Sequence, residues 1–287
     1  MAVTLPQVEM EGPFEVHTLP NGDMVFYRDK DHAYFRDIKH QKNGEWVGRG
    51  RLLGVSTVVA TYSWKADHLM RWAARLERAG IAQLASLGLT CDDAEDMWNE
   101  LSWLRDERTI WDALKQAQLT WEDQRNLAGN RGTRVHKFAL QTLAEGGRMP
   151  DWKEMTEEDK AYARGVVSWW LDTNPQPVAA EHVVADLDMG IAGRLDLIAR
   201  IGQETVLVDA KTGRYLGATA AVQQAGYRYL AEASGLGVVD RAILLKVDEQ
   251  GGYLPVEADA DFEDFEAAVH VYRRANELST SMRKAIG

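Results

Sequence analysis

The spacing of apolar residues along the chain predicts strands first and helices after them. Met24–Phe35 mixes Val, Phe and Tyr with charged residues in the manner of half-buried strands, and Glu45–Val59 continues this pattern. Apolar residues in Leu69–Leu76 then fall at helical spacing, and Gly80 is the expected end of that helix. A long polar segment with a helical stripe of apolar residues follows, from about Asp93 to Leu127.

Two further helices are predicted in the middle of the chain. Gly129–Gly132 is expected to interrupt the chain, because glycine and asparagine favour turns over continuing helices. A helix then begins at Thr133, and one stripe along it carries His136, Ala139, Leu140 and Leu143. Thr156–Asp159 has the form of a capping box that opens a helix running to Trp170.

The second half of the chain alternates strands with helices. Glu181–Asp188, Ile191–Ile201 and Thr205–Lys211 are separated by short turns that contain glycine, which predicts an antiparallel meander. A helix over Gly217–Ser234 follows. The last predicted elements are strands over Arg241–Val247 and Tyr253–Val256, and a closing helix with Phe262, Phe265, Val269 and Tyr272.

This order of elements predicts an α/β (α+β mixed) fold, with a central mixed sheet flanked by helices. We expect two regions. Residues 1–128 would form an N-terminal β/helical extension that packs on a core formed by residues 129–287.

Composition and charge exclude some classes of protein and of metal site, but they do not identify the protein's class. The chain has 287 residues, and no stretch approaches the ~18 consecutive apolar residues of a membrane-spanning helix. The start of the chain lacks the pattern of a secretory signal, so a cytoplasmic protein is expected. The single cysteine, Cys91, excludes an internal disulfide framework, a four-cysteine zinc site and a protein-held iron–sulfur cluster. A net charge of −11 argues against a broad coating of nucleic acid, but it excludes neither a local basic groove nor an acidic metal site.

Carboxylates and a lysine at two strand ends suggest where the chemistry lies. The apolar strand that ends in Val208-Asp209-Ala210-Lys211 places Asp209 and Lys211 on one face, because side chains alternate along a strand. If Gly202-Gln203 is a two-residue hairpin turn, the pairing places Asp196 of the preceding strand opposite Asp209. Carboxylates at such positions, with Cβ atoms ~4.5–5.5 Å apart, repel unless a cation or a proton lies between them. Mg²⁺ or Mn²⁺ is the simplest occupant, and such ions activate water for phosphodiester hydrolysis.

Other candidate residues are open to two interpretations at this point. His136 lies on an apolar stripe, where a lone histidine is more often a hydrogen-bonded core residue than a metal ligand. Gln223 and Tyr227 are four apart and share a helix face, which is weak evidence for a site by itself. Glu181 begins a predicted strand and is equally explained as a strand-end acid.

The order of these motifs supplies a stronger signal than any one of them. The set comprises Arg131–His136, Glu181, Gly193–Asp196, Val208–Gly213 and Gln223–Tyr227. In this order it resembles the RecB-like branch of the PD-(D/E)XK nuclease superfamily, especially phage-encoded exonucleases. The resemblance covers about Gly129–Leu230, and Val55–Val59 is also similar to the front end of that group. It implies a restriction-endonuclease-like core.

The resemblance implies a role for each motif residue. The metal ligands would be His136, Asp196, Asp209 and the backbone carbonyl of Ala210. Lys211 would be the catalytic lysine. Gln223 and Tyr227 match a Q-x-x-x-Y helix that supports the site and approaches DNA, and Glu181 matches an acid of the first core strand.

The function implied by the resemblance is that of a Mg²⁺- or Mn²⁺-dependent DNA exonuclease in phage DNA recombination or processing, acting in the host cytoplasm. Two alternatives stay open: a structure-specific endonuclease on the same core, and a binding or inhibitory protein on a catalytically silent nuclease scaffold. A homo-oligomer around DNA is possible by family analogy. Some relatives hold an iron–sulfur cluster with four cysteines, which this chain lacks.

Overall fold

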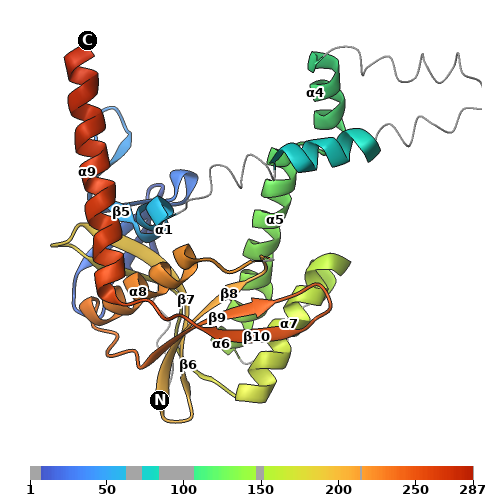
Figure 1. The fold of residues 1–287 in the computed structure, drawn as a ribbon. Helices are drawn as coiled ribbons and strands as arrows, with labels where there is room; N and C mark the ends of the chain where they lie inside the picture. Colours follow the sequence, from blue (N-terminus) through green and yellow to red (C-terminus); the bar gives the residue numbers. More distant parts are fainter. Residues whose placement is uncertain (1–7, 63–72, 84–106, 147–151, 214, 287) are drawn as a thin grey trace, which may run out of the picture. The chain divides into compact units, whose positions relative to one another are not determined.

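The computed structural model describes residues 8–62, 73–83, 107–146, 152–213 and 215–286 (Figure 1). The chain separates into two compact units, one formed by Met1–Ser63 with Arg134–Gly287 and the other by Trp64–Thr133. The N-terminal strands therefore belong to the same unit as the predicted core. The expected boundary between residues 128 and 129 stays a prediction.

In the larger unit, the described strands form one mixed sheet. They are β1 (Glu9–Glu11), β2 (Phe14–Thr18), β3 (Met24–Arg28), β4 (Ala33–His40), β5 (Trp46–Gly54), β6 (Gln176–Asp186), β7 (Ile191–Ile201), β8 (Glu204–Lys211), β9 (Arg241–Val247) and β10 (Tyr253–Glu257). Strands β1 to β5 are an antiparallel meander. Strand β7 lies antiparallel to β6 and β8, while β8 and β9 are parallel. The predicted meander of three strands and the mixed sheet are both confirmed.

Helices cover the sheet within this unit. They are α1 (Val55–Val59), α6 (Thr142–Gly146), α7 (Glu157–Thr173), α8 (Ala218–Ala233) and α9 (Phe262–Ile286), with 3₁₀ turns η1 (Asp29–Asp31), η2 (Ala60–Tyr62) and η5 (Trp152–Glu154) and a π-helical turn η4 (His136–Gln141). No helix in the described part of the chain has the length and apolar character needed to cross a membrane.

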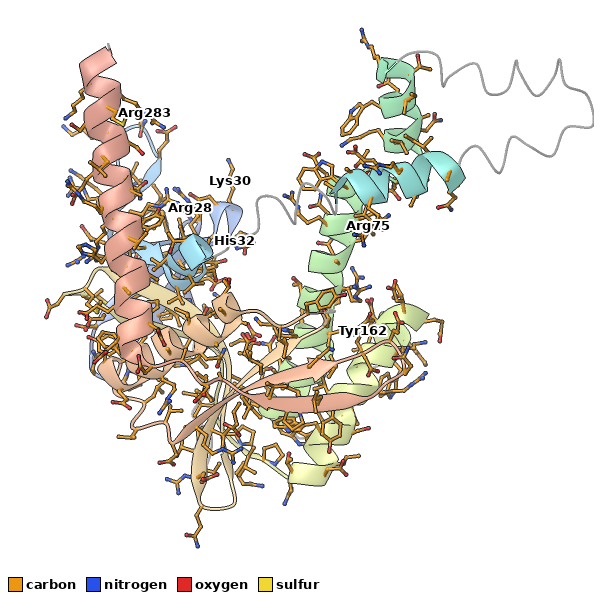
Figure 2. The ribbon with its side chains drawn as sticks, in the orientation of Figure 1. Arg28, Lys30, His32, Arg75, Tyr162 and Arg283 are labelled. Carbon is orange, nitrogen blue, oxygen red and sulfur yellow. The ribbon has the colours of Figure 1, made fainter. Side chains whose placement is uncertain are left out.

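Two hydrophobic clusters lie on opposite faces of the central strands. Leu207 of β8 packs with residues of α1, α8 and α9, whereas its neighbours Val206 and Val208 pack with residues of η4 and α7. This alternation is what a strand buried on both faces requires. Tyr162 of α7, labelled in Figure 2, is buried in the second cluster.

Some local predictions are confirmed by the caps of the helices. Thr156 is the N-cap of α7, and its hydroxyl accepts a hydrogen bond from the backbone N–H of Asp159. Asn174 ends this helix in the left-handed conformation. Helix α8 begins after Gly217 and ends before Ser234, as the sequence predicted.

The prediction of a strand running to Val59 is wrong, because Val55–Val59 is helix α1. Val55, Val58 and Val59 are β-branched, which favours strands, but their spacing also matches one face of a helix. All three are buried against the same cluster. Packing therefore outweighs the weak intrinsic preference of valine.

The predicted interruption at Gly129–Gly132 is also wrong. These residues lie inside α5 (Trp121–Val135), which continues directly into η4. A glycine costs a helix only about 1 kcal/mol relative to alanine. That cost is offset where α5 continues into η4, because Val135 of α5 and Ala139 and Leu140 of η4 are buried.

The smaller unit is helical where it is described. It contains a helix over residues 73–83, which passes the expected stop at Gly80, then α4 (Glu107–Gln116) and most of α5. Leu114 is buried, whereas Trp111, on the same predicted apolar stripe, is 38% exposed. Leu69 lies outside the described residues.

Candidate metal centre

The hairpin between β7 and β8 has the predicted register. Gly202 and Gln203 form its turn, with Gly202 in the left-handed region at φ 64°. Pairing runs from Ile201–Glu204 to Leu197–Val208. Asp196 and Asp209 are the next facing positions, and the backbone pairing of β7 and β8 ends just before them.

The strands β6 and β7 are both irregular where they carry their acids. Leu195 and Leu197 are two apart, so a regular strand would place them on one face, but they pack in the two opposite clusters. The change of face occurs at Asp196. Glu181 stands opposite, between the pairs Ala180–Leu197 and His182–Leu195.

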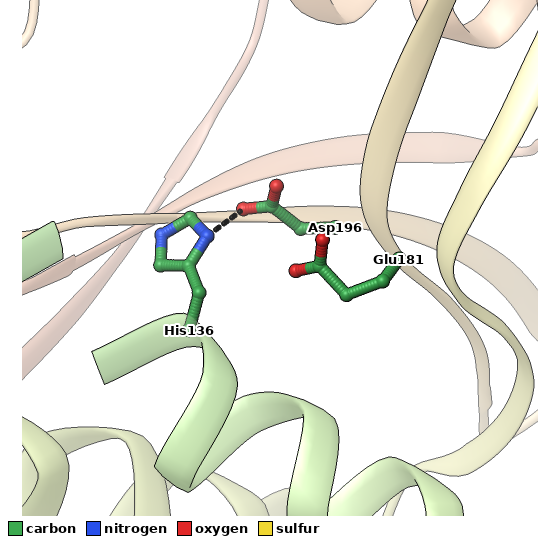
Figure 3. Close-up of side chains that lie close together, drawn as sticks. All are labelled: His136, Glu181 and Asp196. Atoms are coloured by element: carbon green, nitrogen blue, oxygen red, sulfur yellow. Dashed lines mark ion pairs between the residues drawn. The ribbon is translucent and has the colours of Figure 1, made fainter. Parts of the chain in front are cut away.

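Glu181 adopts a backbone conformation that is unusual for its residue type. Its φ of 46° lies in the left-handed region, which costs a residue with a Cβ on the order of 1–3 kcal/mol. In this conformation the Glu181 carboxylate lies close to Asp196, as Figure 3 shows. Backbone strain of this kind is common at ligand-binding positions.

His136 reaches the same place from η4. It is the first residue of η4, and the wider π-helical turn is a feature often found at functional sites. Its Nδ1 lies 3.2 Å from Asp196 Oδ2, and its Nε2 lies 2.7 Å from the backbone oxygen of Ala210. Both ring nitrogens therefore face oxygen atoms, one on β7 and one on β8.

The helical segment that carries His136 is anchored by Arg134, two residues before it. Arg134 donates two hydrogen bonds to Asp159, from Nε at 2.6 Å and from Nη2 at 3.1 Å. Asp159 is fully buried, and burial acts to raise the pKa of its carboxyl, but the hydrogen bonds and positive charge of Arg134 help to lower it below its ordinary value. Sequence reasoning found Asp159 as part of a capping box but did not find its partner, because no local pattern links residues 25 positions apart.

Three predicted site residues form a potential metal-binding group. Ligand atoms of His136, Glu181 and Asp196 all lie within 4.8 Å of one another. The backbone N–H of Ala210 donates to Asp196 Oδ2 at 3.0 Å, so the carbonyl and amide of Ala210 both face this group. Carboxylate and carbonyl oxygens with one imidazole are a donor set that suits Mg²⁺ or, because of the imidazole, Mn²⁺.

Asp209 is not part of that group. Its carboxylate pairs instead with Lys211, whose Nζ lies 2.6 Å from Asp209 Oδ2. The structure therefore places Asp196 with His136 and Glu181, and Asp209 with Lys211, on neighbouring strands. Asp196 and Asp209 follow the register predicted for β7 and β8, and each carboxylate has its own basic partner, His136 or Lys211.

The charges of the two pairs still act on one another. Burial raises the pKa of Asp209 to about 6, and the charge of Asp196 adds to the shift, against the opposing charge of Lys211. Burial and the charge of Asp196 likewise raise the pKa of Glu181 to about 7. Because a cation between carboxylates removes this repulsion, the site is electrostatically prepared for one.

Asp196 and His136 show the opposite effect. Burial would raise the pKa of Asp196, but the positive charge and hydrogen bond of His136, with the charge of Lys211, lower it. Burial would lower the pKa of His136, but Asp196 overcomes it and raises the value to about 9. Both ring nitrogens of His136 face oxygen atoms, and the raised pKa favours the imidazolium, in which both donate. To act as a metal ligand, the ring would release one of these protons when the ion binds.

Helix α8 closes the other side of the site. Gln223 accepts a hydrogen bond from Lys211 Nζ at 3.3 Å, so it contacts the predicted catalytic lysine directly. Tyr227 is buried one turn later. Gly193 makes room for it, because a Cβ at that position would lie 2.6 Å from Tyr227 Cε1.

Two residues near the site have partners that their sequence context does not indicate. Arg194 pairs with Glu15 at 2.5 Å and lies over the ring of Tyr27. Ser56 accepts a hydrogen bond from Gln223 Nε2 at 3.1 Å. Both contacts join segments far apart in the sequence, and no local pattern indicates them.

Comparison with known proteins gives the family of the chain. A search of curated proteins finds no match. The family model described as the PD-(D/E)XK nuclease superfamily matches residues 112–282, which is more than half of the chain. The matched region contains His136, Glu181, Asp196, Asp209 and Lys211, and membership implies metal-dependent nuclease activity. The chain belongs to the PD-(D/E)XK nuclease superfamily.

Proposed function

We propose that this protein is a Mg²⁺- or Mn²⁺-dependent deoxyribonuclease that degrades linear DNA as an exonuclease. The observation that carries the proposal is the convergence of three acids, an imidazole and a lysine from four separate elements, β6, β7, β8 and η4. The resemblance of the motif order to RecB-like, phage-type exonucleases supports the finer assignment and a role in phage DNA recombination or processing.

The residues divide into those that would hold the ion and those that would act on the substrate. His136, Glu181, Asp196, Asp209 and the carbonyl of Ala210 would hold it. A divalent ion bound there would lower the pKa of water and neutralise charge on the scissile phosphate.

Lys211 is the residue that we assign to the reacting atoms. Its ammonium has three N–H groups, of which one faces Asp209 and one faces Gln223. The third is left for the attacking water or for a phosphate oxygen. A fixed positive charge at a partly buried position stabilises the negative charge that develops on the phosphate in the transition state. Asp209 and Gln223 hold the ammonium in place, so little reorganisation is needed during the reaction.

The test is a comparison of linear duplex DNA with covalently closed circles of the same sequence. Purified protein is incubated with each substrate in Mg²⁺ or Mn²⁺ and in excess chelator, and Lys211→Ala serves as the inactive control. Degradation of linear DNA alone supports an exonuclease. Nicking of the circles means an endonuclease on the same core, and binding without cleavage in either metal means a catalytically silent scaffold. Undiminished cleavage in chelator would overturn the metal-dependent assignment.

A further inference from the structure

The end of the N-terminal meander reaches the nuclease centre through helix α1. Strand β5 pairs in parallel with the start of β7, through Leu53–Ile191 and Gly54–Ala192. Helix α1 follows immediately. Its three valines are buried in the cluster shared with α8, and Ser56, between them in sequence, is exposed where α1 meets Gln223 of α8.

A continuous chain of side-chain contacts runs from Ser56 to the acids of β8. Ser56 Oγ accepts from Gln223 Nε2 at 3.1 Å, and Gln223 Oε1 accepts from Lys211 Nζ at 3.3 Å. Lys211 Nζ in turn lies 2.6 Å from Asp209 Oδ2. Burial raises the pKa of Tyr227, the second residue of the Q-x-x-x-Y helix, well above its ordinary value, and the nearby Ser56 side chain acts in the opposite direction.

The chemistry of these groups fixes the orientation of the Gln223 amide. The ammonium of Lys211 is only a donor, so it must face the amide oxygen. The amide NH₂ then points toward Ser56, and it needs an acceptor there. Ser56 supplies that acceptor, and its hydroxyl hydrogen remains available for Tyr227. A residue without an oxygen at position 56 would leave the amide free to rotate and would deprive Lys211 of one of its two fixed partners.

We propose that Ser56 is a positioning residue of the nuclease centre, which holds the Gln223 amide in the orientation that fixes Lys211. This inference rests on the proposed function, because it assigns Lys211 to the reacting atoms. It also gives the N-terminal meander a specific role, since through α1 the meander completes a site whose acids and lysine all come from the matched family region.

The main test compares three variants by steady-state cleavage of linear DNA. Ser56→Ala removes the acceptor with little change in volume and should lower kcat about three- to tenfold, the effect of one neutral hydrogen bond, with KM nearly unchanged. Ser56→Thr keeps the hydroxyl and should restore kcat to near the parental value. Thr57→Val is the matched control, because Thr57 is exposed on the same helix and its hydroxyl is not part of the chain of contacts.

A double-mutant cycle and crystal structures separate positioning from a general loss of structure. In a Gln223→Ala background, Ser56→Ala should have no further effect on kcat, because the group that it orients is already absent. A crystal structure of Ser56→Ala should show the Gln223 carbonyl turned away from Lys211, while Ser56→Thr keeps the contact. Parental kcat in Ser56→Ala, or equal losses with and without Gln223, would overturn the inference.

The two proposals fail in different ways. A parental protein that cleaves no DNA would remove the proposed function, and the crystal structures would then decide alone whether Ser56 orients Gln223. A parental protein that cleaves, with a Ser56→Ala variant that cleaves equally well, would leave the nuclease assignment intact and remove only the role of Ser56.

Discussion

Asp196 and Asp209 occupy facing positions at the end of one strand pair, but their neighbours shift their acidities in opposite directions. The neighbours from η4 form the helical side of the site, and those from α8 form its α8 side. On the helical side, His136 and the Ala210 amide donate to Asp196, and the pKa of its carboxyl is lowered. On the α8 side, burial and the charge of Asp196 raise the pKa of Asp209 to about 6, although Lys211 pairs with it. Two aspartate side chains thus have pKa values shifted in opposite directions by their different neighbours.

This difference suggests a division of work between the two sides. A carboxyl group that stays ionised is suited to hold a cation at all physiological pH values. A carboxyl group with a raised pKa, paired with a lysine, is suited to gain or lose a proton when the charge beside it changes. Pairs of acids whose surroundings separate their pKa values commonly have distinct roles in one site. We therefore expect the effects of substitutions on the two sides to differ in type as well as in size.

The largest effect is expected on the α8 side, from Lys211→Ala. The ammonium acts on charge that exists only in the transition state, so its removal should lower kcat by at least about 100-fold. Binding of DNA and of Mn²⁺ should remain close to parental. Cleavage is measured under single-turnover conditions, and Mn²⁺ affinity by calorimetry. Lys284→Ala, at an exposed position near the end of α9, is the control and should cleave normally. A folded Lys211→Ala protein with parental cleavage would remove the assignment of the whole site.

The next largest effect is expected on the helical side, from His136→Gln. The loss of an imidazole ligand should weaken Mn²⁺ binding and cleavage by at least about tenfold, and added Mn²⁺ should recover part of the activity. This response to metal distinguishes His136 from Lys211, whose loss no metal concentration should correct. His270→Gln, exposed on α9, serves as the control. If His136→Gln melts and cleaves like the parent, His136 is a core residue and the helical side has no catalytic function.

The sequence predicted the parts of this comparison that depend on local pattern. The two-residue turn at Gly202–Gln203 determines the register of β7 and β8, so the facing positions of the two aspartates followed from it. The capping box at Thr156 and the Gln223–Tyr227 face are likewise local, and the structure contains both. The roles of the site residues stay predictions until they are measured.

Long-range packing decided what the sequence could not. Nothing local shows that Glu181 adopts a left-handed conformation, that Arg134 pairs with Asp159, or that His136 pairs with Asp196. The helix at Val55–Val59 and the uninterrupted α5 have the same origin. In these last two cases, intrinsic preferences worth about 1 kcal/mol or less per residue were outweighed by burial.

A moderate effect on stability is expected from Asp159→Asn, which removes the anchor of the helical side. The folded-state pKa of Asp159 is lowered, so its contribution to stability is full above its unfolded pKa of about 3.9 and is lost as pH falls through the folded value. At pH 7 the free energy of unfolding should fall by about 1–3 kcal/mol, less than for a fully buried pair because the Arg134 side chain is 35% exposed.

The control for this measurement is the pH dependence itself. Chemical denaturation at pH 7 and near pH 3 should show the difference between Asp159→Asn and the parent shrinking as the pH falls. Asp188→Asn, at an exposed acid without a comparable partner among the described residues, should show little effect at either pH. An equal loss at both pH values would mean that the carboxylate charge does not anchor the helix.

The smallest effect, and the most direct test of the comparison, is the change in stability of the metal-free protein when each aspartate is replaced in turn. A carboxyl group whose folded pKa is raised destabilises the fold when it ionises, and this penalty grows as pH rises from about 4 to about 6 and is full above that. Asp209→Asn should therefore raise the melting temperature at pH 8, with a gain of about 1 kcal/mol or less because Lys211 loses its partner, and the gain should vanish near pH 4. Asp196→Asn should lower the melting temperature at pH 8, because the lowered pKa of Asp196 means that its ionised form stabilises the fold. With saturating Mn²⁺, both variants should lose the stabilisation that the metal gives the parent. Equal signs for the two substitutions without metal would show that the two sides of the site do not shift the acidities of their aspartates in opposite directions.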